Sequence, residues 1–419
     1  MNIIQKIKEK GLLHCVDSAF RIVSFEITDS INNLLFFLAK SCFPIKENRI
    51  VLESEGDYSD NGQALYAYMR DHGYLERYEV IWLASEPGIL KKRYGLKACK
   101  RQTTSIHWST NYYLATCKYY IYDHNNRFER IHKRKEQYLL YITHGFSYKA
   151  AKGYDHSKVK TSFDKMVVTG DIPAKGNTRF WNVEIGRAVK LGYPRIDYFF
   201  SDLSSVKEAV EQAYHFSDFS SVILWMPTFR KSNARELSEE YLTNETGLPL
   251  FHTRQDLEEF QTFLNEHRIL FILKLHHLQA DLPIFQSKFS NLLIVKDDSL
   301  FEKDIQLYQF IALTDALVTD YSSISVDYML LDRPIIYTLD DYEEYRASRG
   351  IWPENAIDFM AGYHVYTVED LKKAILEIDS GLDIYKDRRN RSIGSFHTYA
   401  DGNSSKRILD YLERSDWQE

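Results

Sequence analysis

The sequence of 419 residues has few cysteines, no long apolar run and no excess of basic residues. Its four cysteines form no Cys-x-x-Cys pair and have no histidine at metal-ligand spacing, which favours a reducing compartment without disulfides or structural zinc. No apolar run approaches the roughly 20 residues that cross a bilayer, so we expect no transmembrane span. A net charge of −6 gives no reason to expect a nucleic-acid partner.

Apolar residues make up 44% of the chain and charged residues 27%, which is typical of a globular protein. The length exceeds that of one compact core and predicts two domains. Residues 1–11 interleave lysines with isoleucines and have no small-residue cleavage site, so we expect no secretory signal there.

The first forty residues have the spacing of one amphipathic helix, which Pro44 ends. Apolar side chains recur three or four residues apart, at Leu13, Val16, Phe20, Val23, Ile27, Ile31, Leu34 and Leu38. This spacing places them on one stripe. Two interpretations stay open. The helix packs on its own domain, or it lies in a membrane interface with Lys6, Lys8, Lys10 and Arg21 facing lipid head groups.

Beyond residue 48, short β-branched runs alternate with helical stretches, which predicts βαβ units around parallel sheets. The first series has candidate strands at 49–53, 79–84, 119–122, 138–143, 167–169 and 188–191. The second series has them at 222–226, 269–275, 292–295, 316–319 and 334–337. Thr253 with Asp256, and Thr367 with Asp370, have capping-box spacing and predict two helix starts.

Ligands of parallel α/β sheets bind beyond the carboxyl ends of the strands, so the residues that follow each predicted strand are the candidates for chemistry. His144 follows the strand at 138–143, and Gly145 after it permits a close approach of a ligand. An exposed imidazole there could act as a general base, although the spacing alone favours a loop histidine that caps a turn. Arg230 follows the strand at 222–226 and is either a phosphate ligand or a solvated cation.

Two further strand ends carry candidates. Lys274 and His276 could neutralise a leaving group, whereas the adjacent His276 and His277 cannot easily face one zinc ion. Hydrogen bonding of the two histidines to the backbone is the alternative. Ser322 and Ser323 would lie at a helix N-terminus, where N–H groups attract phosphate, although plain N-capping would use the same residues.

Taken together, these motifs resemble the bacterial CDP-glycerol:glycerophosphotransferase family, whose members build or prime teichoic acids and related poly(polyol phosphate) chains. The resemblance covers about residues 48–410. It includes Ser59-Asp60-Asn61, Thr143-His144-Gly145 with Lys149, Gly192-Tyr193-Pro194-Arg195-Ile196-Asp197, Pro227-Thr228-Phe229-Arg230, Leu275-His276, Thr319-Asp320-Tyr321-Ser322-Ser323 with Asp327 and Pro334, and Tyr399-Ala400-Asp401-Gly402 with Arg407. The family usually has tryptophan at the position of Thr143 and Arg-Leu-His-Pro at 274–277, so the polyol and the acceptor stay open.

The resemblance implies a GT-B fold, with two Rossmann-like α/β domains that face each other across a cleft. An N-terminal amphipathic segment at 1–44 would precede an acceptor-side domain at 45–205 and a CDP-polyol-binding domain at 206–398, and a closing helix would occupy 399–419. No cofactor or metal ion is expected, since the CDP-polyol is a substrate and the chain has no Asp-x-Asp motif.

The chemistry implied by the resemblance is transfer of a polyol phosphate. A hydroxyl of a lipid-linked acceptor would attack the β-phosphorus of CDP-glycerol or CDP-ribitol, and CMP would leave. His144 would be the catalytic base, and His276, the second catalytic residue, would steady the diphosphate and the departing CMP. The implied substrate-binding residues are Gly145, Lys149, Arg195, Thr228, Arg230, Lys274, Asp320, Tyr321, Ser322, Ser323 and Asp327. The alternatives are a GT-B glycosyltransferase that uses a nucleotide sugar, and a non-catalytic membrane-associated module.

A basic stretch precedes His144 and could hold a membrane or a polyanionic acceptor. Its cations are Arg127, Arg130, Lys133, Arg134 and Lys135. With the N-terminal helix, this stretch predicts an enzyme that binds peripherally to the cytoplasmic face of the cell membrane. A solvated basic loop is the plain alternative. The sequence leaves open whether the protein is a homo-oligomer.

Overall fold

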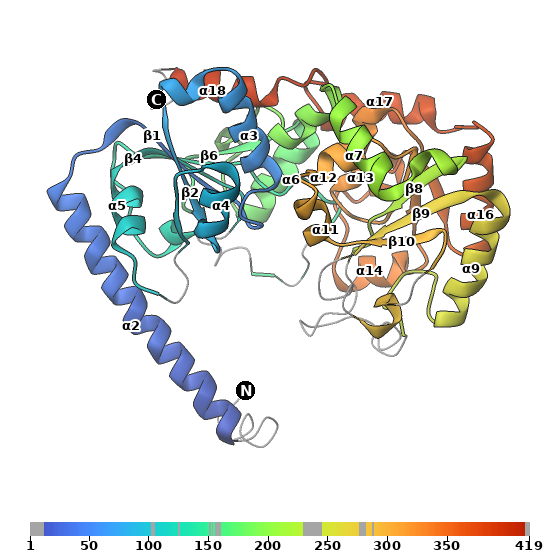
Figure 1. Ribbon diagram of the computed structural model, residues 1–419, viewed down its shortest axis with the longest axis horizontal. Coiled ribbons are helices and arrows are strands. Elements are labelled where there is room, and N and C mark those ends of the chain that lie inside the picture. The colour runs from blue at the N-terminus through green and yellow to red at the C-terminus, as the bar shows by residue number, and fades with distance from the viewer. Residues whose placement is uncertain are drawn as a thin grey trace. The chain divides into compact units, whose positions relative to one another are not determined.

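Figure 1 shows the computed structural model of the chain. The structure describes residues 12–101, 105–124, 126–150, 152, 154–155, 161–228, 245–275, 282–286 and 289–414. The chain forms two compact units, the first from residues up to Thr143 with 160–166, and the second from His144–Val159 with the residues from Val167 onward.

The first sheet has seven strands in the order β3-β2-β1-β4-β5-β6-β7, and the division between the units falls within β6. The strands are β1 (Lys46–Glu53), β2 (Glu79–Ala84), β3 (Ala98–Lys100), β4 (Cys117–Tyr122), β5 (Tyr138–Tyr141), β6 (Lys165–Val168) and β7 (Ala188–Lys190). Strand β1 pairs in parallel with β2 on one side and with β4 on the other. All six residues of β4 are buried, as expected of a parallel strand that is covered on both faces.

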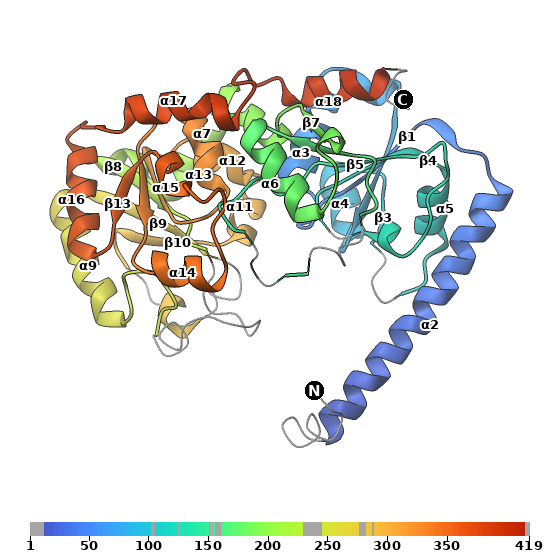
Figure 2. The same cartoon turned by 180° about the vertical axis from the view of Figure 1, so that it is seen from behind.

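The helical segments of the first unit are α2 (Leu12–Cys42), α3 (Asp60–Asp71), η1 (Tyr74–Glu76), α4 (Pro87–Tyr94), α5 (Trp108–Thr116) and η2 (Arg127–Glu129). The C-terminal half of α2 packs along α5, while its N-terminal half extends past the sheet of this unit (Figures 1 and 2). Residues Phe20–Cys42 of α2 form one helix of 23 residues that is long and apolar enough to cross a membrane. The statement that no segment approaches the length of a membrane span was therefore wrong, because the polar residues that interrupt this segment leave its mean hydropathy at 1.3. The expectation that the chain has no transmembrane span stays a prediction.

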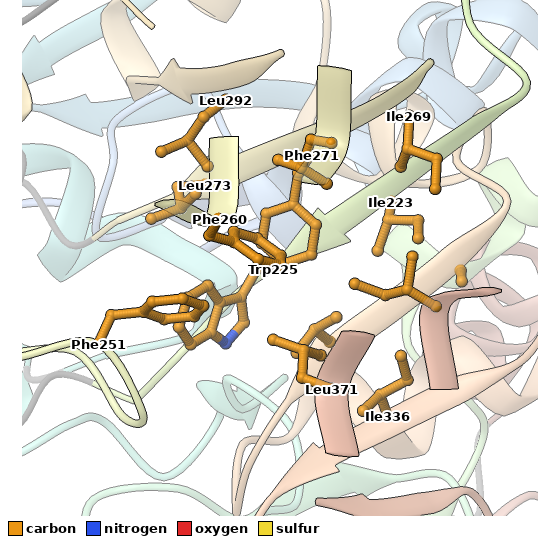
Figure 3. Packing of buried hydrophobic residues seen from close by; sticks show 14 of the residues in the cluster. Ile223, Trp225, Phe251, Phe260, Ile269, Phe271, Leu273, Leu292, Ile336 and Leu371 are labelled. Carbon is orange, nitrogen blue, oxygen red and sulfur yellow. The ribbon is translucent and has the colours of Figure 1, made fainter. Parts of the chain in front are cut away.

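The second sheet has six parallel strands in the order β10-β9-β8-β11-β12-β13. The strands are β8 (Ser221–Trp225), β9 (Ile269–Lys274), β10 (Leu292–Val295), β11 (Ala316–Thr319), β12 (Ile335–Thr338) and β13 (Tyr363–Val365). Figure 3 shows the apolar core on one face, where Trp225 contacts the rings of Phe251 and Phe271. Large, fully buried side chains of this kind supply the main driving force for folding of the unit.

The helical segments of the second unit are α6 (Asp171–Trp181), η4 (Ile185–Arg187), η5 (Pro194–Phe200), α7 (Ser204–Tyr214), η6 (Phe216–Asp218), α9 (Arg254–His267), η7 (Pro283–Gln286), α11 (Asp297–Glu302), α12 (Leu307–Ile311), α13 (Ile324–Tyr328), η8 (Met329–Leu331), α14 (Tyr342–Ser348), α15 (Ala356–Phe359), α16 (Val368–Asp379), α17 (Lys386–Phe396) and α18 (Ser404–Glu413). Both predicted capping boxes are confirmed, at Thr253 for α9 and at Thr367 for α16. The two helices lie side by side (Figures 1 and 2). Residues of both line one surface groove.

Candidate active site

The order of the strands locates the ligand-binding edge of the second unit. From β8 the chain builds outward through β9 and β10, whereas β11, β12 and β13 extend the sheet on the other side. The direction of building thus reverses between β8 and β11, and open α/β sheets bind ligands beyond the carboxyl ends of the strands at such a point. Thr228 and Asp320 follow β8 and β11 and therefore lie at this position.

Asp320 joins the two loops at this edge. Its side chain is fully buried and accepts hydrogen bonds from the backbone nitrogen of Thr228 at 2.8 Å and from the Thr228 hydroxyl at 2.6 Å. Tyr321 is also fully buried, and its hydroxyl donates to Asp341 at 2.9 Å. Asp320 thus joins the loops that follow β8 and β11, and Tyr321 joins those that follow β11 and β12. Both side chains are buried, so they position these loops and are not exposed at the edge.

Other predicted ligands lie at the same edge. Ser323 is the N-cap residue of α13 and makes no side-chain cap hydrogen bond, while Ser322 beside it is half-buried. Lys274 is the last residue of β9 and is largely buried. Arg230 and His276 lie outside the described residues, so their placement stays a prediction.

The loop that begins at His144 belongs to the second unit. The His144 side chain is exposed, and the backbone that follows it is attached to the loop after β11, because the Tyr148 N–H donates to the Tyr321 carbonyl at 3.2 Å. The Trp352 N–H donates to the Tyr148 carbonyl at 2.9 Å, and Lys149 forms a bridge with Ile351. The structure therefore fastens the histidine loop to the edge of this unit at which a ligand is expected to bind.

Arg195 and Asp327, both predicted as substrate ligands, form an ion pair of 2.7 Å in the second unit. The Arg195 side chain also donates to the His144 carbonyl oxygen at 3.0 Å. Contacts within this unit thus bring together the His144 backbone, Gly145, Arg195, Ser323 and Asp327.

The first unit has its own reversal of strand order, between β1 and β4, and a charged cluster lies there that the motif analysis missed. Arg101 lies 3.0 Å from Glu53, and His124 lies 3.5 Å from Glu53 and 3.0 Å from Asp123. Burial of His124 opposes its protonation, but the hydrogen bonds with Asp123 and Glu53 outweigh burial and raise the pKa of His124 to about 9. The cluster could have been predicted from the sequence, because Asp123 and His124 directly follow the predicted strand at 119–122.

The backbone at Thr143, where the first unit ends, is strained. Thr143 has a φ of +43°, a left-handed conformation that is rare for a β-branched residue. The Asn61 side chain donates to the carbonyl oxygens of Ile142 at 3.1 Å and of Thr143 at 2.9 Å. Asn61 therefore holds the end of the strand segment in this conformation.

Two carboxylates of the first unit also lie close together. Carboxylate oxygens of Asp60 and Asp123 lie within 4.8 Å of one another.

A sequence model of the CDP-Glycerol:Poly(glycerophosphate) glycerophosphotransferase family matches residues 35–414. The chain belongs to this family. A teichoic acid ribitol-phosphate primase of Bacillus spizizenii is 23% identical, with 92% of this chain and 96% of that protein covered. A poly(ribitol-phosphate) polymerase of the same organism is 26% identical over 91% of this chain but only 59% of its own length. A glycerol-phosphate primase of Bacillus subtilis is 26% identical over 61% of this chain and 59% of its own length.

Solved structures give the fold of this glycerophosphotransferase-family chain. The wall teichoic acid polymerase TagF superposes with a TM-score of 0.72 at 19% identity, with 98% of each chain covered. A histidine-to-asparagine variant of TagF soaked with CDPG superposes with a TM-score of 0.73 at 20% identity, with 94% of this chain and 96% of that chain covered. These likenesses, with the two parallel sheets, confirm the GT-B fold. The predicted domain limits stay a prediction.

The basic stretch of this family member lies against α2 within the first unit. The Arg127 side chain is paired with Asp29 and bonded to Asn33, and Arg130 lies 3.4 Å from Glu26. Lys133 binds Asp164 at 2.5 Å, and Arg134 donates to the Phe43 carbonyl at 2.7 Å. These cations attach α2 and neighbouring segments to the unit. Their predicted contact with an acceptor or a membrane stays a prediction.

Proposed function

We propose that this protein transfers a polyol phosphate from a CDP-polyol to a hydroxyl of a teichoic-acid-type acceptor and releases CMP. The observation that carries the proposal is the family match over residues 35–414, within which the chain retains the histidine motif at 144. Attachment of the His144 loop to the edge where the second sheet is expected to bind a ligand supports it.

The reaction is a displacement at phosphorus. The acceptor hydroxyl gives its proton to the His144 imidazole as its oxygen forms a bond to the β-phosphorus of the donor. The bond from that phosphorus to the bridging oxygen breaks, and CMP leaves with the electron pair. Lys274, with Arg230 and His276, balances the charge that develops on the diphosphate, and the hydroxyls of Ser322 and Ser323 donate to its oxygens. No cofactor takes part.

Purified protein, an acceptor primed with one polyol phosphate, and a choice of donors test this proposal. We expect release of CMP from CDP-glycerol or CDP-ribitol, together with extension of the acceptor by one or more polyol phosphates in mass spectra. Release of UDP from UDP-sugars, with no CMP from either CDP-polyol, would favour a glycosyltransferase instead. No turnover of any donor would favour the binding-module alternative.

We also propose that the enzyme docks peripherally on the cytoplasmic face of the membrane through α2. The stripe of α2 that faces away from α5 exposes large apolar side chains, with Phe20 at 72% and Ile27 and Leu34 each at 57% exposure. The opposite face carries the buried Asn32, Phe36 and Ala39. An exposed apolar stripe on a helix of this length suits the boundary between head groups and acyl chains.

The polar face of α2 favours lying in the interface over crossing the bilayer. Asp29 in the middle of the helix is paired with Arg127, and both side chains are largely buried in the first unit. Passage of α2 across a bilayer would break this pair and place the Asp29 carboxylate in the hydrocarbon without its partner, which is costly. Interfacial docking leaves the pair intact.

A further inference from the structure

A buried ion pair in the second unit joins two segments that lie 132 positions apart in the sequence. Arg195, in η5, is 4% exposed, and Asp327, in α13, is 1% exposed. Removal of both charges from water is unfavourable, and an apolar pair of similar size is often as stable or more so. The burial of this pair therefore points to a role other than stability.

Neighbouring side chains hold both members in one orientation. The Tyr308 hydroxyl donates to Asp327, and the Arg195 guanidinium carbon lies 4.7 Å from the centroid of the Tyr308 ring. The ring of Tyr193 lies on the guanidinium as well, at 5.4 Å. His397 donates to the Val326 carbonyl at 2.9 Å and so fixes α13 beside Asp327. The guanidinium therefore has a defined direction rather than a range of rotamers.

The nitrogen of Arg195 that binds Asp327 also binds the backbone of the histidine loop. Its Nη2 donates to the His144 carbonyl oxygen at 3.0 Å. Gly145 has a φ of +105°, and a Cβ added to it would lie 2.6 Å from Nη2 and 3.1 Å from the Ser323 Cβ. Glycine is thus required both for the conformation and for the close approach of Arg195.

We propose that Arg195 and Asp327 are positioning residues for His144 rather than ligands of the donor. Asp327 orients the guanidinium, the guanidinium fixes the peptide between His144 and Gly145, and this peptide sets the direction in which the imidazole leaves the backbone. The proposal rests on the proposed function, in which His144 is the base. A base that is displaced from the attacking hydroxyl loses rate without losing donor affinity.

The first test is Arg195→Lys, which keeps the charge but ends one bond short of Nη2, the nitrogen that serves both acceptors. We expect kcat to fall on the order of 10- to 100-fold, while KM for the CDP-polyol changes by less than about threefold. A donor-binding arginine would show the opposite split, so a large rise in KM with kcat retained overturns the proposal.

The decisive test combines Arg195→Lys with His144→Ala. Without an imidazole there is nothing left to position, so we expect Arg195→Lys to lower the residual rate of the His144→Ala variant by less than about twofold. If the losses from the two substitutions multiply instead, Arg195 acts independently of His144 and the proposal is overturned.

Arg389 offers a matched control in the same unit. Its side chain is fully buried and paired with Asp332 at 2.8 Å and with Asp383 at 2.7 Å, and neither partner belongs to the histidine loop. We expect Arg389→Lys to lower the melting temperature as Arg195→Lys does but to leave kcat within about twofold. An equal loss of kcat in this control would show that weakening any buried ion pair of this unit lowers the rate, and it would overturn the proposal.

A structural readout separates this proposal from the proposed function. If the parent releases CMP from neither CDP-polyol, the proposed function fails, and the NMR signal of the His144 imidazole, assigned by its loss in His144→Ala, still reports positioning. We expect that signal to move or broaden in Arg195→Lys and to stay unchanged in Arg389→Lys. An unchanged signal in Arg195→Lys overturns the proposal. If Arg195→Lys fails to fold, Tyr308→Phe, which removes only the hydroxyl bonded to Asp327, takes its place under the same criteria.

Discussion

At the scale of single residues, His144 combines an exposed side chain with a backbone fixed by its neighbours. The Arg195 side chain holds its carbonyl oxygen, and the loop beyond it is bonded to Tyr321. An exposed imidazole on a rigid support suits proton transfer, because the base must meet the attacking hydroxyl in one geometry.

Replacement of His144 by alanine should therefore remove the base and leave the donor site intact. We expect His144→Ala to lower turnover by at least about 10²-fold, with the dissociation constant of the CDP-polyol unchanged within about threefold. CMP release and equilibrium binding measure the two quantities. Full activity of the variant would remove His144 from the mechanism.

His124 predicts a pH dependence of stability. Its pKa in the folded protein is about 9, above the usual value near 6.5, so the folded state favours the imidazolium beside Asp123 and Glu53. The resulting stabilisation is fully present below about pH 6.5 and is lost as pH rises through about 9. It amounts to a few kcal/mol at most, because a tenfold change in proton affinity corresponds to about 1.4 kcal/mol.

Urea unfolding of the parent and of His124→Gln at several pH values measures this effect. We expect the parent to be the more stable protein at pH 6, and the difference between the two to shrink steadily up to about pH 9.5. A difference that does not vary with pH would mean that His124 does not change its charge on unfolding.

At the scale of secondary structure, α2 has two faces with different tasks. One face packs on the first unit through Asn32, Phe36 and Ala39, and the other exposes the apolar stripe. The periodicity of the sequence correctly identified the stripe but left open whether the helix packs on its own domain or lies in a membrane interface. The structure shows that one face packs on the first unit and that the stripe does not. Polar contacts decided this, because Asp29 and Asn33 bind Arg127 from the basic stretch.

Removal of the stripe should abolish docking on membranes. We expect the triple variant Phe20→Gln, Ile27→Gln, Leu34→Gln to bind anionic vesicles at least about 10²-fold more weakly, since each buried side chain of this size contributes about 1.5–3 kcal/mol. Turnover of a short soluble acceptor should persist, because these side chains are exposed. Co-sedimentation with vesicles measures binding.

Exposed apolar residues elsewhere on the chain supply the control. Ile185, Leu382 and Ile384 are 57%, 46% and 59% exposed, and the same three changes to glutamine there should leave vesicle binding unaltered. Equal losses in both triple variants would mean that general surface hydrophobicity, and not α2, drives the association.

At the scale of the whole molecule, the expected chemistry depends on side-chain cations and N–H donors rather than on a divalent ion. We expect CMP release in excess EDTA to stay within about twofold of the untreated rate. The pair formed by Asp60 and Asp123, which sequence spacing did not reveal, makes this measurement informative. A strict requirement for a divalent ion would contradict the proposed mechanism and direct attention to that pair.

Local pattern was sufficient to predict the strands that are buried on both faces, since short, continuous apolar runs such as 119–122 and 222–226 are typical of strands covered on both sides. It also determined the helix starts at Thr253 and Thr367, because a capping box is a local interaction within four residues. The edge strands β3 and β13 escaped prediction, because each has only three residues and shows no periodicity.

The contacts of the charged residues could be learned only from the folded chain. Arg195 and Asp327 resemble loop cations and helix-start acids in sequence, and nothing local indicates that they are buried together across 132 positions. The pKa of His124 is raised by the adjacent Asp123 and also by Glu53, and the contact with Glu53 on β1 could not be read from the local sequence. The burial of apolar side chains can be predicted from the local sequence pattern, because an apolar side chain is stable in any apolar interior and needs no particular partner. A buried charge depends on one particular partner, and only the folding of distant segments supplies that partner.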